Sequence, residues 1–395
     1  MKTLCPAFLS PSVVVLRVAT ALLLALITFA IHGAAQTSAD SDHPATSIIV
    51  HSKFGGQIYG FDIDQKGTEG VLTEAAMLAN GNIQAAVETF SQSTGEILKV
   101  VTQTQDQDDF ITLGVVGTSV GLVEHEHSIS LFDVQRTFDV IDPLSGNKLT
   151  SMWTPPVGTT HLIKEVSRNQ GVINNAVFAY DNSDNFIPWV YSSDVAANTF
   201  GPVIHITDSL NFGSVVPPMA YNPKTNEAIL GGGDGCFGCF PVIGVANLKN
   251  GTFTEFTGVG FGFVNGIAMD SADNIAVTTT EDDASVEFYD LNADTNFTVV
   301  LPNSGENQIF SGADVEFDPI HKLFLIAQPV SSSAPSGSTI YVYDTSGNLQ
   351  ETLNGFSFSN AFNVIGTYIG LNPSKRTGFV NGPSETVNEL QGFSY

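Results

Sequence analysis

A repeat of about 50 residues constrains the fold of this chain more than any other feature. Four segments share one pattern, in which an apolar run ends in Asp or Asn and a polar turn leads into a second apolar run. These Asx residues are Asn222, Asp270, Asp318 and Asn372, spaced 48, 48 and 54 residues apart. An Asx side chain at the start of a turn can bond the backbone two residues on. Each hairpin is followed by another, so a unit holds four strands, a to d, as in a β-propeller blade.

The same pattern continues upstream in a less regular form. First turns near Asp64, Gly117 and Asn169 bring the number of units to seven. The last unit lacks a d strand, whereas the chain has a spare strand, "TSIIVHS", before the first complete unit. We therefore predict an all-β, seven-bladed β-propeller of four-stranded blades over residues 47–395, closed by the N-terminal strand completing the last blade. The alternative is an open array of sheets or two separate β domains. Helix-like segments are scarce, and the best helical candidate is "TEAAMLAN" (73–80).

The N-terminus predicts export. Lys2 and Arg17 supply positive charge, and residues 18–31 form an apolar run too short for a comfortable membrane span. We read residues 1–35 as a secretory signal peptide and 36–46 as a disordered polar lead, with an uncleaved anchor as the alternative. No later segment is apolar enough to span a bilayer, which predicts a secreted protein, periplasmic or extracellular, with no membrane span after cleavage.

The excess of acidic residues restricts the kinds of molecule that this chain can bind. The chain has 14 Lys and Arg against 40 Asp and Glu, a formal net charge of −26. Such a surface repels nucleic acid and anionic membranes. It suits an extracellular protein, a small molecule or a cation.

The propeller topology sorts the polar residues into two groups. The a–b and c–d turns carry the repeated Asx and Gly, which turn formation explains. The b–c and d–a loops meet at the other end, are more irregular, and supply the candidates for a ligand site at the channel mouth: Asp108, Asp109, His161, Asp234, Asn265, Glu281, Asp282, Asp283 and Asp314. Clusters of oxygen ligands suit Ca²⁺ or Mg²⁺. An acidic rim without a bound ion explains the same residues.

Two other features bear on metal chemistry. His125 and His127 fall on one face of a strand and can share a transition metal, with His161 as the third ligand. A strand end with surface polar residues is the alternative. No nucleophile motif or phosphate-binding loop occurs, so no catalytic residue is identified.

Cys236 and Cys239 lie among glycines in "GGGDGCFGCF" (231–240). For an exported chain we expect a disulfide between them that staples a b–c loop. A redox motif would require a helix start in a βαβ setting, and a zinc half-site lacks its second pair of ligands. Both remain as alternatives.

One blade carries a family resemblance. "FVNGIAMDSADNIAVTTTEDDASVEFYD" (263–290) resembles a blade of the NHL and SMP-30/gluconolactonase-like propellers. In SMP-30-like lactonases a divalent cation sits at the channel mouth on a Glu, an Asn and an Asp. The resemblance implies Asn265 as a cation ligand and Asp314 as a second one, aligned one residue off. The first blade offers no equivalent Glu.

Two function classes follow. The first is a secreted propeller that binds a ligand or protein partner at its irregular loop face without catalysis. The second is a hydrolase or lactonase that depends on a divalent cation at the channel mouth, with Ca²⁺ as the candidate cation. Whether the chain is an enzyme is left open, since the catalytic constellation is incomplete.

Overall fold

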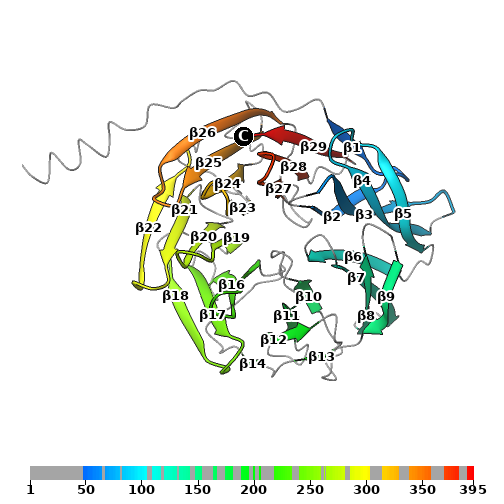
Figure 1. Ribbon diagram of the computed structural model, residues 1–395. Coiled ribbons are helices and arrows are strands. Elements are labelled where there is room, and N and C mark those ends of the chain that lie inside the picture. Colours follow the sequence, from blue (N-terminus) through cyan, green and yellow to red (C-terminus); the bar gives the residue numbers. More distant parts are fainter. Residues whose placement is uncertain are drawn as a thin grey trace, which may run out of the picture. The chain divides into compact units, whose positions relative to one another are not determined.

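Strands make up the whole of the regular structure that the computed structural model describes (Figure 1). It describes residues 48–395 except 65–66, 81, 105–108, 117–119, 131–132, 143–146, 154–162, 167–173, 181–187, 195–198, 201–203, 206–217, 234–239, 259–261, 263, 281–284, 303–313, 329–337, 357–368 and 382–388, with only the strand backbones given between 102 and 203. Residues 1–47, including the expected signal peptide, lie outside the described part. Among the residues described, no helix is long and apolar enough to cross a membrane.

The described strands form seven antiparallel sheets, numbered here in chain order. Sheet 1 comprises β2 (Gln57–Ile63), β3 (Glu69–Met77), β4 (Ile83–Ser91) and β5 (Ile97–Thr104). Sheet 2 comprises β6 (Asp109–Val116), β7 (Val120–Ser130), β8 (Asp133–Asp142) and β9 (Asn147–Trp153). Sheet 3 comprises β10 (Ile163–Val166), β11 (Asn174–Tyr180), β12 (Pro188–Asp194), β13 (Thr199–Phe200) and β14 (Ile204–His205). Sheet 4 comprises β15 (Met219–Asn222), β16 (Glu227–Gly233), β17 (Pro241–Asn247) and β18 (Phe253–Thr257).

Sheet 5 comprises β19 (Val264–Asp270), β20 (Ile275–Thr280), β21 (Ser285–Asp290) and β22 (Thr295–Val300). Sheet 6 comprises β23 (Val315–Asp318), β24 (Leu323–Gln328), β25 (Ser338–Asp344) and β26 (Leu349–Phe356). Sheet 7 comprises β27 (Ile369–Asn372), β28 (Thr377–Asn381) and β29 (Glu389–Ser394), with β1 (Ile49–His51) as its fourth strand. The pairing of β1 with β29 joins two ends of the chain, and Val50 lies opposite Leu390.

The sheets pack face to face, because each hydrophobic cluster draws on two consecutive sheets. One cluster combines Ile229 and Ile243 of sheet 4 with Met269 and Tyr289 of sheet 5. Edge-to-face aromatic pairs join Phe288 to Phe324 across sheets 5 and 6, and Phe90 to Phe379 across sheets 1 and 7. Sheets covered on both faces need apolar residues on both faces, which explains the almost fully buried strands β16 and β24.

The helical candidate of the sequence is wrong. Residues 73–77 belong to β3, whose central part is buried. Strand β3 lies between β2 and β4, with a register that runs from Glu69 opposite Ser91 to Met77 opposite Ile83. The Ala-rich composition favours a helix locally, but backbone pairing on both edges and burial of both faces outweigh that small preference.

Candidate functional site

The two ends of sheets 4 to 6 differ in the lengths of their connections. We call the end with the a–b and c–d connections the turn end, and the end with the b–c connections and the step to the next sheet the loop end. The turn end of sheets 4 to 6 consists of short turns at 223–226, 248–252, 271–274, 291–294, 319–322 and 345–348. At the loop end, the connections at 301–314, 329–337 and 357–368 are longer.

The repeated Asx residues shape the turn end, as the sequence predicts. Oδ1 of Asp318 accepts the amides of Ile320 at 2.7 Å and His321 at 2.9 Å. Asp270 and Asn222 accept the amides two and three residues on in the same way. All three Asx side chains are buried. A carboxylate or amide oxygen thus replaces water for backbone groups that the tight turn leaves unpaired.

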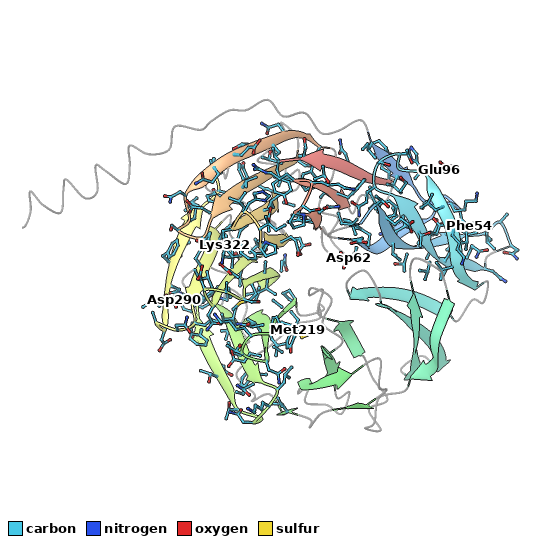
Figure 2. The ribbon with its side chains drawn as sticks, in the orientation of Figure 1. Phe54, Asp62, Glu96, Met219, Asp290 and Lys322 are labelled. Carbon is cyan, nitrogen blue, oxygen red and sulfur yellow. The ribbon has the colours of Figure 1, made fainter. Side chains whose placement is uncertain are left out.

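The same Asx residues also link neighbouring sheets, which the sequence does not reveal. Asn222 donates to Asn274 of the next sheet at 2.8 Å. Lys322, labelled in Figure 2, donates from Nζ to both oxygens of Asp270 at 2.8 and 3.0 Å. The hydroxyl of the last residue, Tyr395, donates to Asp318 at 2.9 Å.

Asn372 completes this series from sheet 7 to sheet 1. Its Nδ2 donates to Oε1 of Gln92 at 2.8 Å and to the carbonyl of Gly67 at 3.2 Å. The side chains that first attract attention at the turn end are therefore occupied in holding turns and sheets together. The turn end thus has a structural role, which leaves the loop end as the candidate place for a ligand site.

At the loop end, Asn265 occupies a β-bulge. The register of β19 against β20 shifts between Val264 and Gly266, so Asn265 is the extra residue. Strand β2 has the same irregularity between Ile58 and Gly60. The half-buried Asn265 side chain is thereby released from the regular alternation of the strand. Bulges re-aim side chains in this way, often beside functional sites.

Asp314 lies immediately before β23 and has backbone partners on two sheets. Its Oδ1 accepts the amide of Val315, and its Oδ2 accepts the amide of Ile369 at the start of β27, both at 3.0 Å. Its own carbonyl accepts the amide of Ala327 at 3.0 Å. These bonds give Asp314 a structural role, which is to fix the first strands of sheets 6 and 7 against each other.

A buried carboxylate pair lies beneath the β1–β2 loop. Oε1 and Oε2 of Glu74 accept the amides of Phe54 and Gly56, both at 2.8 Å, and Oε2 of Glu88 accepts the amide of Lys53 at 2.9 Å. Both Glu side chains are fully buried. Burial, and secondarily the adjacent Glu74 charge, raises the pKa of Glu88 to about 8, although the amide of Lys53 opposes the shift.

Gly56 makes this loop possible. A Cβ at this position would lie 2.5 Å from the backbone carbonyl of Ala75 in β3. Only glycine allows the loop to approach the strand closely enough for its amides to reach Glu74.

A third buried carboxylate recurs at the matching position of sheet 5. Glu287 in β21 and Glu88 in β4 both stand three residues before the c–d turn residue of their strand. The hydroxyl of Tyr289 donates to Glu287. Burial and the Glu287 charge raise the pKa of Tyr289, so the phenol remains protonated as the donor. The sequence signal for these sites is a Glu inside an otherwise apolar strand.

Most other predicted site residues lie outside the described part of the structure. In backbone register, Asp109 pairs with His127, and Ile111 pairs with His125, so both histidines lie in strand β7 as expected. The rest are outside the described residues: Asp108, His161, Asp234, Cys236, Cys239, Glu281, Asp282 and Asp283. Within the described residues, no group of three or more His, Cys, Asp or Glu side chains is placed to hold a metal ion.

Comparison with known proteins bears on the fold. No protein-family model matches the chain, and no curated protein matches its sequence. The β-propeller domain of Cps50 (Swd1) from Myceliophteria thermophila is similar in structure, with a TM-score of 0.53 at 9% identity over 89% of this chain and 99% of that one. The chain has a β-propeller fold.

Raptor from Chaetomium thermophilum gives a TM-score of 0.56 at 11% identity and covers 89% of this chain. The match spans 29% of the Raptor chain. Similarity at this level of identity shows the fold alone. The resemblance of residues 263–290 to NHL and SMP-30-like blades finds no support in the family comparison and stays a prediction.

Proposed function

We propose that this protein is a secreted, seven-bladed β-propeller that binds an extracellular protein or small-molecule ligand through its loop end. The seven sheets and the pairing of β1 with β29 support the blade number and closure by the N-terminal strand. Export rests on the expected signal peptide.

The difference between the two ends carries the proposal. Short turns locked by Asx side chains occupy the turn end, whereas the connections at 301–314, 329–337 and 357–368 are longer. Rigid scaffolds place recognition residues on such longer connections. The acidic residues 281–283 belong to this end and favour a partner with basic groups, or a cation.

Site-specific photo-cross-linking tests this function. A photoreactive amino acid placed at position 333 or 282 should give adducts with a partner when the full protein is incubated with the extracellular fluid of its source. The same group at position 292, on an exposed turn-end position, is the matched control and should give none. Adducts from position 292 alone would contradict a loop-end binding site.

A cation-dependent hydrolase is the second candidate, and the bulge at Asn265 is the observation in its favour. Both carboxylate oxygens of Asp314 accept hydrogen bonds from backbone amides, which weakens the case for Asp314 as a metal ligand. Metal analysis of the purified protein, with and without chelator, separates the two candidates. A stoichiometric divalent cation that Asn265→Ala abolishes would favour the hydrolase, whereas a metal-free protein whose melting temperature ignores Ca²⁺ would favour the binding function.

A further inference from the structure

The chain contains two Asn-X-Thr sequences, and the structure distinguishes them. They are Asn250-Gly251-Thr252, between β17 and β18, and Asn296-Phe297-Thr298, within β22. This sequence is the acceptor for N-linked oligosaccharides in eukaryotic secretion. We propose that, when a eukaryotic cell secretes this chain, Asn250 is an N-glycosylation site and Asn296 is not. The inference rests on the export proposed above.

The side chain of Asn250 is arranged for the reaction. Its Oδ1 accepts the Thr252 amide at 3.0 Å and the Thr252 hydroxyl at 2.8 Å. Both donors withdraw electron density from the amide oxygen, which makes the Nδ2 hydrogens more acidic. Because the two donors occupy the oxygen, Nδ2 is the end of the amide left for a glycan.

The surroundings of Asn250 have room for an oligosaccharide. The residue and both of its sequon partners are exposed on a c–d turn. Gly251 has a φ of +75°, and no heavy atom lies within 4 Å of the place where its Cβ would be. The turn is closed by local bonds, since Oδ1 of Asn247 accepts the amides of Lys249 and Asn250 at 3.1 and 3.2 Å. A turn held by bonds between neighbours in sequence can form before the sheets assemble.

The environment of Asn296 differs in each respect. It lies in an extended strand opposite Tyr289, and its half-buried side chain donates from Nδ2 to the carbonyl of Thr257 in β18 at 3.4 Å. In a strand, residues two apart lie on one face, about 7 Å from each other. An extended backbone therefore does not bring the Thr298 hydroxyl to the Asn296 amide in the way that the turn brings the Thr252 hydroxyl to Oδ1 of Asn250, at 2.8 Å. A glycan on Nδ2 would take the place of the contact with the neighbouring sheet.

Transfer of the oligosaccharide to Asn250 requires one co-reactant, the glycan donor. The donor is an oligosaccharide linked through a diphosphate to a polyprenol, held by the transferase of the host. Nδ2 of Asn250 attacks the anomeric carbon, the bond from that carbon to the diphosphate oxygen breaks, and the polyprenyl diphosphate leaves. The Nδ2 proton passes to a base of the transferase, and nothing is oxidised or reduced.

The test is secretion of the full chain from a eukaryotic host, followed by peptide mass spectrometry after amidase deglycosylation, which converts a glycosylated Asn to Asp. We expect Asp at position 250 and Asn at position 296. Asn250→Gln and Thr252→Ala should each abolish the glycan-dependent shift in gel mobility, while Asn296→Gln, the matched control, should leave it unchanged.

Two outcomes would overturn the assignment: an unglycosylated Asn250 in the secreted protein, or a glycan at Asn296. If the native leader fails to export the chain, residues 1–35 are replaced by a leader of the host, and the same peptides are measured. Failure of export then counts against the proposed secretion, while an unmodified Asn250 in the exported protein counts against the site.

Discussion

At the scale of single residues, the buried Glu88 makes the stability of this propeller depend on pH. Glu88 is fully enclosed, and burial followed by the Glu74 charge raises its pKa to about 8. In the unfolded chain the pKa of Glu88 returns to about 4.5. The folded state therefore retains a proton that the unfolded state has lost between these two values. Stability from this group is fully present below about pH 4.5 and is lost as pH rises toward 8.

We predict that Glu88→Gln reduces this pH dependence. The Gln side chain retains an oxygen for the Lys53 amide but has no charge to bury. Between pH 5 and pH 9, the free energy of unfolding of the wild type should fall by roughly 2–4 kcal/mol more than that of the variant. Urea unfolding at both pH values measures the difference. The exposed Glu96→Gln is the matched control, and equal pH slopes for wild type and Glu88→Gln would contradict the prediction.

At the scale of elements, the Asx side chains both close turns and link neighbouring sheets. The loss of unfolding free energy on removing such a side chain should depend on how deeply it is buried. Asp318 accepts two turn amides, Nδ1 of His321 at 2.7 Å and the hydroxyl of Tyr395. Asp290, labelled in Figure 2, accepts two turn amides in the same pattern, but residues 292–294 of its turn are exposed. Water can replace a lost carboxylate at Asp290, whereas the donors around Asp318 would be left buried and unpaired.

Asp318→Ala should therefore lower the free energy of unfolding by roughly 2–4 kcal/mol, and Asp290→Ala by about 1 kcal/mol. Chemical denaturation of the two variants measures both costs. Tyr395→Phe removes one of the donors alone and should have an intermediate cost. If Asp318→Ala and Asp290→Ala had equal effects, the link between sheets 6 and 7 would contribute nothing to stability.

These turns also show what a sequence can predict about such elements. The Asx positions, the hairpins after them and the seven units are visible in the residue pattern, because each depends on neighbours in sequence. The partner of each Asx on the next sheet is not visible, since Asp318 and Tyr395 meet only once two sheets pack. The Ala-rich stretch at 73–77 predicts a helix, because its pairing with β2 and β4 and the packing of β3 against sheet 7 are not visible in the local sequence.

At the scale of the whole molecule, the candidate site was harder to predict than the fold. The Asn-Gly pair predicts Asn265 as a cation ligand, and the structure places Asn265 at a β-bulge. Asp314 is predicted as a second ligand, yet its carboxylate accepts amides at the starts of two strands. The residue pattern does not reveal the buried Glu74 and Glu88, because a single Glu within a strand has no recognisable spacing. Packing follows from a repeated pattern, but a site depends on single residues from different repeats.

At this scale, β1 connects the start of the described chain to sheet 7 as its fourth strand. Val50 is fully buried in a cluster with Leu390 and Phe379, and the carbonyl of Ile48 accepts the amide of Gly392 at 2.9 Å. A chain that begins at Ser52 lacks β1 and leaves the β29 edge unpaired. We expect its melting temperature to fall by roughly 10 °C, with aggregation through the open edge.

A chain that begins at Ser47 is the matched control, because it loses only the residues before β1 and should melt like the full chain. A synthetic peptide of residues 46–52, added to the chain that begins at Ser52, should restore part of the lost stability by pairing with β29 in trans. Recovery should require the register seen here, so the same peptide with Val50→Asp should fail, since Val50 is the buried residue of the strand. An unchanged melting temperature for the chain that begins at Ser52 would show that pairing of β1 with β29 contributes nothing to stability.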